Sequence, residues 1–202
     1  MRIGLACALA ASLAIPASAQ VSDVSPEVRE LHERLLVLDT HLDIPSRFDS
    51  GEWDFSERHR YEWDGTQTDL PRMVEGGLDG GFFVIYTPQG ALTPEGYREA
   101  RDRALVRATA IHRVIGENRE HMSLALAADD IERLHREGRR IALISMENSW
   151  PLGEDLSLLT TFHRLGLRMA GPVHSRTNQL ADSTTGEATW NGLSPLGRQW
   201  VA

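Results

Sequence analysis

The sequence of 202 residues contains no lysine and a single cysteine. All 21 basic residues are arginine, so Schiff-base chemistry, a P-loop lysine and a Ser-Lys dyad are excluded. The cysteine, Cys7, lies close to the amino terminus, so residues 20–202 offer no disulfide, no thiol and no cysteine-type zinc site. Any metal bound by residues 20–202 would need histidine and carboxylate ligands.

Positive charge and long apolar runs are also scarce. The formal net charge is −8, and no basic stripe is present, which argues against nucleic acid as a partner. No apolar run reaches the roughly 20 residues that a membrane-spanning helix needs. We therefore expect a chain without a transmembrane segment and without a nucleic-acid partner.

Residues 1–19 have the pattern of a secretory signal peptide. Arg2 is followed by an apolar run over 3–15 and by Pro16-Ala17-Ser18-Ala19, an A-x-A-like cleavage site. A lipoprotein signal at Cys7 is the less favoured alternative, because the apolar run before it is short. We expect an exported protein, periplasmic or secreted, and the absence of disulfides favours a bacterial cell envelope.

Apolar strands alternate with helices along the rest of the chain. Strands are predicted over residues 36–39, 80–86, 140–146 and 168–173. Helices are predicted over residues 26–35, 69–77, 94–115, 128–138, 155–165 and 194–200, and a long polar loop over 46–68. This alternation predicts an α/β fold built on a parallel sheet.

Each predicted strand runs into polar side chains at its carboxyl end. These side chains are His41 and Asp43, Tyr86, Glu147, and His174, in strand order. Barrels and open α/β sheets place their chemistry at the carboxyl ends of the strands. A carboxylate directly after a buried strand, such as Glu147, needs a partner or a metal. Imidazole and carboxylate oxygen are standard zinc donors, so His41, Asp43 and Glu147 are candidate metal ligands.

Structural interpretations of the same residues stay open. His41 could be a core histidine oriented by Asp39, and His174 could be a satisfied buried histidine. Asn178 and Asp182 could be capping groups or substrate contacts. The meeting of four strand ends at one edge favours a joint site over four separate structural roles.

Five motifs, in order, resemble the membrane (renal) dipeptidase family, the M19 zinc peptidases. They lie at residues 39–45, 77–86, 145–148, 174–183 and 192–197. The first resembles the family's His-x-Asp metal motif, the third contains the position of its metal-bridging glutamate, and the fourth contains that of its substrate-binding histidine. The resemblance covers essentially the whole mature chain.

The resemblance implies a (β/α)8 TIM-type barrel of the metal-dependent hydrolase kind, with two zinc ions. His41 and Asp43 would ligate one zinc, and Glu147 would bridge both. A dipeptide would be the substrate, including one with a D-residue at its carboxyl end, and hydrolysis would involve Glu147 and His174 as catalytic residues. The substrate-binding residues would be His174, Tyr86, Asn178 and Asp182.

Family members are roughly twice this length, in keeping with eight strands in about 250 residues or more. Residues 20–202 are therefore expected to form the N-terminal half of the barrel, without the remaining ligands of the second zinc. A homodimer of the full-length protein stays open.

Two other interpretations remain for the function. The chain could be a non-catalytic remnant or pseudoenzyme that binds at most one metal. It could also be another amidohydrolase-type metal hydrolase, but such enzymes usually open with His-x-His, and His41-Leu42-Asp43 argues against that.

Overall fold

The computed structural model describes residues 24–202, and the predicted signal peptide over 1–19 lies outside this range. The chain divides into two compact units after Leu35. In the first unit, helix α1 (Pro26–Glu33) begins where the Ser25 hydroxyl accepts a hydrogen bond from the Val28 amide, and it buries none of its residues. All other elements belong to the second unit, 36–202.

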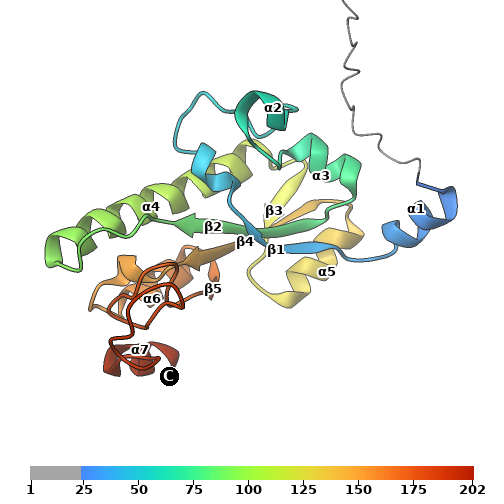
Figure 1. The fold of residues 1–202 in the computed structure, drawn as a ribbon. Helices are drawn as coiled ribbons and strands as arrows, with labels where there is room; N and C mark the ends of the chain where they lie inside the picture. The colour runs from blue at the N-terminus through green and yellow to red at the C-terminus, as the bar shows by residue number, and fades with distance from the viewer. Residues whose placement is uncertain (1–23) are drawn as a thin grey trace, which may run out of the picture. The chain divides into compact units, whose positions relative to one another are not determined.

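Residues 36–202 fold around a five-stranded, parallel sheet (Figure 1). Its strands are β1 (Leu38–Leu42), β2 (Gly80–Tyr86), β3 (Met122–Leu124), β4 (Arg140–Glu147) and β5 (Leu167–Ala170). β2 lies between β1 and β4, while β4 also pairs with β3 near its start and with β5 near its end. The predicted parallel α/β sheet is confirmed.

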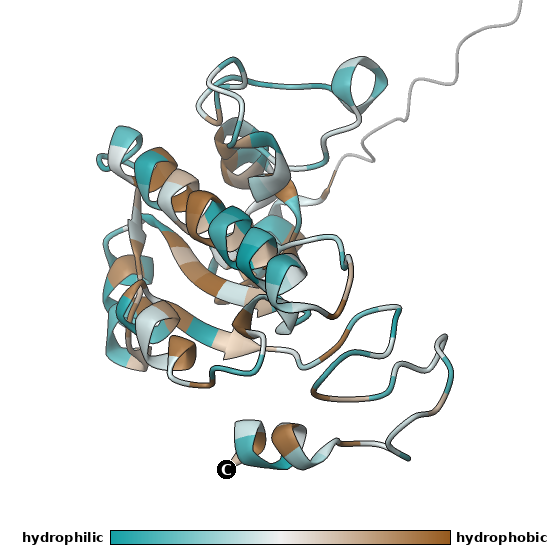
Figure 2. Cartoon of the chain, turned by 90° about the vertical axis from the view of Figure 1, so that its left-hand side faces the viewer, coloured by the Kyte–Doolittle hydropathy of each residue, from teal (hydrophilic) through white to brown (hydrophobic). Residues whose placement is uncertain are grey.

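Helices lie between the strands and after β5. They are η1 (Ile44–Arg47), α2 (Tyr61–Asp64), α3 (Leu70–Gly76), α4 (Pro94–Glu117), α5 (Ala128–Arg136), η2 (Trp150–Leu152), α6 (Leu158–Arg164) and α7 (Pro195–Val201). Helix α4 carries polar and hydrophobic residues along its length (Figure 2), and its buried positions include Ala100, Ala104 and Ala108, whose small side chains allow close packing. Within 24–202, no helix combines the length and the apolar character required to cross a bilayer.

Several predicted elements have other bounds in the structure, and β3 is an additional strand. The predicted strand over 168–173 ends at Ala170. The first strand continues to Leu42, because the polar residues after the apolar run stay extended. The three residues of β3 are too few to give a periodic pattern, and the predicted loop 46–68 includes helix α2. Helix α6 begins only at Leu158, because the Asp155 carboxylate accepts hydrogen bonds from the amide and hydroxyl of Ser157 and forms a turn before it.

Aromatic packing orders the long segment 46–68. Phe48 and Phe55 are each 1% exposed, and their ring centroids lie 5.6 Å apart in an edge-to-face arrangement. Phe55 packs in the same way against Phe83 of β2, with centroids 5.9 Å apart. The segment is thereby fixed against the sheet, next to the end of β1.

Gly80→Ala should destabilise the sheet. A Cβ at residue 80 would lie 2.6 Å from the Cβ of Ile141 on β4 and closer still to the Ile141 carbonyl oxygen. We expect the free energy of unfolding in urea to fall by about 1–3 kcal/mol, as for other overpacked sites.

The matched control is Gly116→Ala in α4, where an added Cβ meets nothing within 4 Å. This change should be neutral or stabilise the protein by up to about 1 kcal/mol. Equal losses of stability in the two variants would contradict the steric explanation.

Candidate metal site

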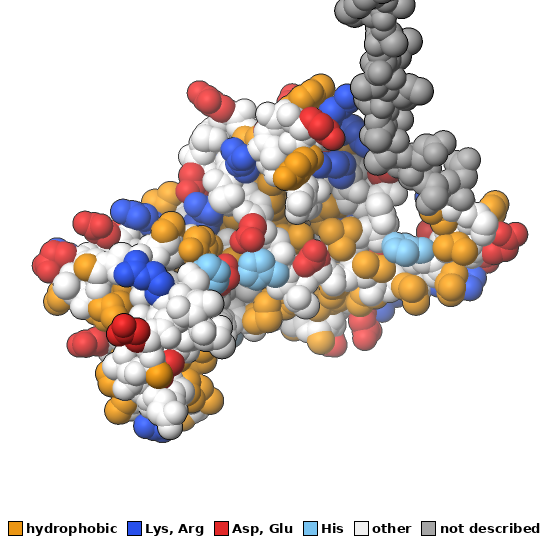
Figure 3. Space-filling model, viewed as in Figure 1, with side chains coloured by type: hydrophobic (Ala, Val, Ile, Leu, Met, Phe, Trp, Pro, Cys, Tyr) orange, Lys and Arg blue, Asp and Glu red, His pale blue; other side chains and the backbone are white. Residues whose placement is uncertain are grey.

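The register of the sheet brings strand ends to one edge. Tyr86 and Glu147, the last residues of β2 and β4, are direct partners, and Leu42 at the end of β1 is opposite Phe83 of β2. Histidine and acidic side chains are exposed side by side near the middle of the face shown in Figure 3. The polar strand ends therefore share one region, as the sequence predicts.

Strand β1 is irregular where it carries His41. Its pairing with β2 shifts between Asp39 and Leu42, and the His41 amide donates a 2.8 Å hydrogen bond to the Asp39 carboxylate. Such irregularities redirect side chains near functional sites. The chain then turns into η1, with Asp43 at its N-cap and Pro45 in its first turn. Asp39 thus orients the His41 backbone.

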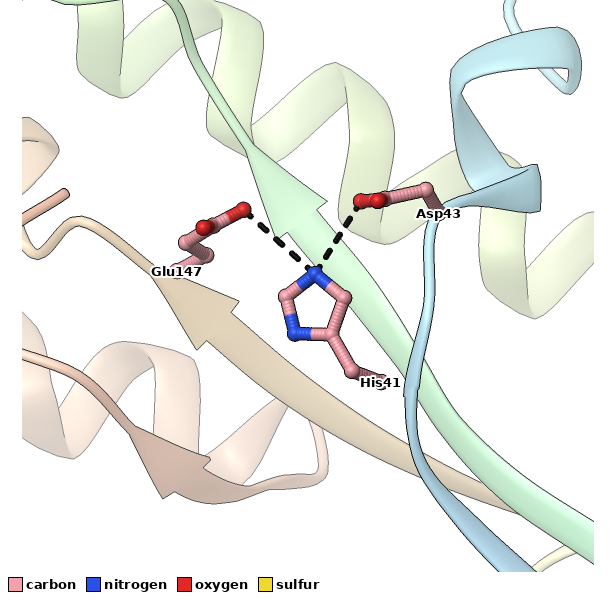
Figure 4. A group of neighbouring side chains, drawn as sticks. All are labelled: His41, Asp43 and Glu147. Atoms are coloured by element: carbon pink, nitrogen blue, oxygen red, sulfur yellow. Dashed lines mark ion pairs between the residues drawn. The ribbon is translucent and has the colours of Figure 1, made fainter. Parts of the chain in front are cut away.

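His41, Asp43 and Glu147 point toward one another from β1, the turn after β1 and the end of β4 (Figure 4). His41 Nε2 lies 3.3 Å from Asp43 Oδ1 and 3.5 Å from Glu147 Oε2. One possible ligand atom from each residue lies within 4.8 Å of the other two. No other such group of three or more occurs in the part of the chain that the structure describes.

The distances from His41 Nε2 to the two carboxylates suit a shared metal ion. Zinc bonds of about 2.1 Å at tetrahedral angles place neighbouring ligand atoms about 3.4 Å apart. The observed separations of 3.3 and 3.5 Å agree with that spacing. The Glu147 side chain is only 23% exposed, whereas the Asp43 side chain is 70% exposed, so the group is accessible from the Asp43 side.

A second imidazole faces the other oxygen of Glu147. His174 Nε2 lies 3.2 Å from Glu147 Oε1, and the His174 ring packs edge-on against Tyr86 with centroids 5.3 Å apart. Burial, together with the negative charges of Glu147 and Asp43, raises the pKa of Tyr86. The phenol therefore keeps its proton at neutral pH and can donate a hydrogen bond beside the two carboxylates.

The side-chain oxygens of Asn178 and Asp182 accept hydrogen bonds from backbone amides of their own loop. Asn178 is fully buried, and its Oδ1 accepts hydrogen bonds from the amides two and three residues ahead. Asp182 accepts hydrogen bonds from amides within residues 189–192. Burial would raise the pKa of Asp182, but these hydrogen bonds outweigh it and lower the pKa. Both residues belong to the loop framework, and their substrate contact stays a prediction.

The segment 46–68 supplies a wall beside the candidate metal ligands. A cleft of about 270 Å³ is lined by His41, Asp43 and residues 65–68, among others. Within this wall, the Asp64 carboxylate accepts hydrogen bonds from the Thr66 hydroxyl at 2.6 Å and from the Thr66 amide at 2.9 Å.

Two ring side chains complete the surroundings of Asp64. Its Oδ2 accepts a 3.0 Å hydrogen bond from the Trp53 indole and lies 2.9 Å from His59 Nδ1. The Trp53 and His59 rings stack with centroids 4.2 Å apart. The hydrogen bonds, with that from the Thr66 hydroxyl the most important, hold the pKa of Asp64 well below its usual range.

A parallel α/β sheet with imidazole and carboxylate donors at the carboxyl ends of its strands is the arrangement used by barrel-type metal-dependent hydrolases. The family model for membrane dipeptidase (Peptidase family M19) matches residues 25–202. The chain therefore belongs to the membrane dipeptidase family.

Three relatives illustrate the likeness. Dipeptidase tcpJ of Claviceps purpurea is 34% identical over 66% of this chain and 32% of its own length. The probable dipeptidase PvdM from Pseudomonas aeruginosa has a TM-score of 0.75 at 30% identity, over 86% of this chain and 45% of its own. A metallopeptidase from Rhodobacter sphaeroides, solved with a phosphinate mimic of the dipeptide L-Ala-D-Ala, has a TM-score of 0.65 at 28% identity.

That last structure matches 83% of this chain and 55% of its own. The chain thus spans about a third of the length of the curated relatives and about half of the solved ones. The predicted fold class, a part of a TIM-type barrel, is confirmed by these neighbours.

Asp64→Asn should weaken the wall at neutral pH and reduce its sensitivity to acid. Because the pKa of Asp64 is lowered in the fold, its contribution to stability is complete above the ordinary carboxyl pKa of about 4 and is lost as the pH falls toward the folded pKa. We expect a lower Tm at neutral pH and a smaller fall in Tm between about pH 5 and pH 2, measured by scanning fluorimetry.

Asp129→Asn, at an exposed position in α5, is the control and should keep the wild-type pH profile of Tm. A wild-type profile for Asp64→Asn as well would show that Asp64 does not stabilise the wall.

Proposed function

We propose that His41, Asp43 and Glu147 bind zinc, and that the whole protein to which they belong hydrolyses dipeptides. The convergence of these three donor groups within 4.8 Å carries the proposal. Membership of the M19 family and the dipeptide mimic bound by the Rhodobacter sphaeroides relative support it. In the two-zinc site that the family resemblance implies, His41 and Asp43 would hold one ion, and Glu147 would be shared by both ions.

Bound zinc would lower the pKa of a water molecule and polarise the scissile carbonyl. Glu147 directs one oxygen toward His41 and the other toward His174, so a single carboxylate orients both imidazoles. The His174 side chain is 42% exposed, so its imidazole is accessible to a substrate oxygen that gains negative charge. Tyr86, with its raised pKa, offers a donor next to it.

The shape and polarity of the surroundings favour a small polar substrate. The cleft beside His41 and Asp43 has a volume of about 270 Å³, and side chains such as Ser46, Gln67 and Thr68 line it. This volume is slightly smaller than that of typical small-molecule pockets, which begin at about 300 Å³. L-Ala-D-Ala is therefore a suitable first test substrate.

Glu147→Gln should remove both zinc binding and hydrolysis. A neutral amide replaces the carboxylate that faces both imidazoles, so we expect the zinc Kd to rise by more than about 100-fold in calorimetric titration. Hydrolysis of L-Ala-D-Ala by the zinc-loaded, full-length gene product should fall below about 1% of the wild-type rate.

Glu154→Gln, at an exposed position between η2 and α6, is the control and should change neither quantity. Unchanged zinc content and affinity in Glu147→Gln would refute its role as a ligand. Zinc binding by a wild-type protein that cleaves no dipeptide would instead favour the non-catalytic alternative.

We also propose that the protein is exported, to the periplasm or to the exterior. The basic start, apolar run and A-x-A-like site within residues 1–19 support this proposal. Amino-terminal sequencing of the protein after expression in a bacterial host should give Gln20 as the first residue. A protein that retains Met1 would contradict the proposal.

A further inference from the structure

Three amide side chains connect the loops that follow β2, β4 and β5. Gln89 follows β2, Asn148 follows Glu147 at the end of β4, and Asn178 lies in the loop after β5. Asn178 Nδ2 donates to Asn148 Oδ1 at 2.9 Å, and Asn148 Nδ2 donates to Gln89 Oε1 at 3.3 Å. We refer to these three residues as the amide network.

The amide network is anchored on both sides of His174. Asn178 Nδ2 also donates to the Pro172 carbonyl at 2.8 Å, and Gln89 Nε2 donates to the Thr177 carbonyl at 2.9 Å. Pro172 and Thr177 flank the segment that carries His174. These hydrogen bonds therefore hold the segment that carries His174 to the loops that follow β2 and β4.

Asn148 also has an unusual backbone conformation. Its φ is 61°, in the left-handed region, which asparagine tolerates better than most other residues with a side chain. Asn148 is only 1% exposed, and both its side-chain oxygen and its side-chain nitrogen are hydrogen-bonded. Directly after this turn, the amide and the hydroxyl of Ser149 donate to the Gly171 carbonyl. The backbone that presents Glu147 is thus fixed from its carboxyl side.

We propose that Asn148, acting through the amide network, is a positioning residue that sets the direction of the Glu147 carboxylate and its separation from the His174 imidazole. These two groups lie 3.2 Å apart, on loops that the Asn148–Asn178 hydrogen bond joins. A buried polar network with its partners in place holds such loops in one arrangement. The inference rests on the functions proposed above for Glu147 and His174.

Asn148→Gly tests the proposal, because glycine keeps the left-handed backbone and removes only the amide. We expect the zinc Kd to rise about tenfold, as is typical when support for a metal ligand is lost. In the metal-free protein, the nuclear Overhauser effect between the Tyr86 and His174 rings, whose centroids are 5.3 Å apart, should weaken.

The control variant is Asn118→Ala. It too removes a buried, hydrogen-bonded amide side chain. The amide of Asn118 donates to the Val114 carbonyl at the carboxyl end of α4, away from the amide network. Asn118→Ala should lower the Tm without changing the zinc Kd or the Tyr86–His174 effect.

Gln89→Ala removes one end of the amide network at a half-buried position, and it serves as the test if Asn148→Gly does not fold. It should produce the same two changes. Wild-type zinc affinity and a wild-type ring-to-ring effect in either folded variant would overturn the proposal, and so would equal changes in Asn118→Ala. The ring-to-ring measurement needs no metal, so a protein that binds no zinc would refute the proposed function and leave the positioning role open to measurement.

Discussion

The site depends on the register between β2 and β4. Residues from Gly80 to Tyr86 pair without interruption with residues from Ile141 to Glu147, so the two strands end at the same level. Close packing maintains this register, because Gly80 lies where any side chain would collide with Ile141. A slip by one residue would turn Glu147 to the opposite face of the sheet and away from His41.

Local irregularities in the backbone then adjust the directions of the side chains at the strand ends. The shift in β1 between Asp39 and Leu42 redirects His41, and the immediate turn into η1 brings Asp43 beside it. On the far side of the group, the left-handed turn at Asn148 ends β4 directly after Glu147. The regular sheet thus brings the candidate ligands to the same level, and short-range hydrogen bonds set the directions of their side chains.

These two kinds of order explain what could be predicted from the sequence. The bounds 80–86 of β2 follow from a continuous apolar run that begins at two glycines, and the meeting of His41, Asp43 and Glu147 follows from the geometry of parallel strands. The shift in β1 could not be predicted, because it accompanies a hydrogen bond that the Asp39 carboxylate accepts from the His41 amide, and such a bond leaves no periodic pattern.

The roles of the loop residues could not be predicted from the sequence either. Asn178 and Asp182 are polar residues in a polar loop, and only the folded structure shows that backbone amides occupy their oxygens. Asn148 carried a weak signal, since asparagine directly after a strand is a common choice for a left-handed turn. Its link to Gln89, 59 residues earlier, is a long-range contact that a single sequence does not reveal.

The difference between an edge strand and a central strand has a consequence for hydrogen exchange. Among the strands of 36–202, β4 pairs with three others, whereas β1 pairs with β2 alone. Local opening begins where a strand has few neighbours, so the amide hydrogens of β1 should exchange with solvent sooner than those in the middle of β4. An ion held by His41, Asp43 and Glu147 would fasten β1 to β4, so its occupancy and the opening of β1 are thermodynamically linked.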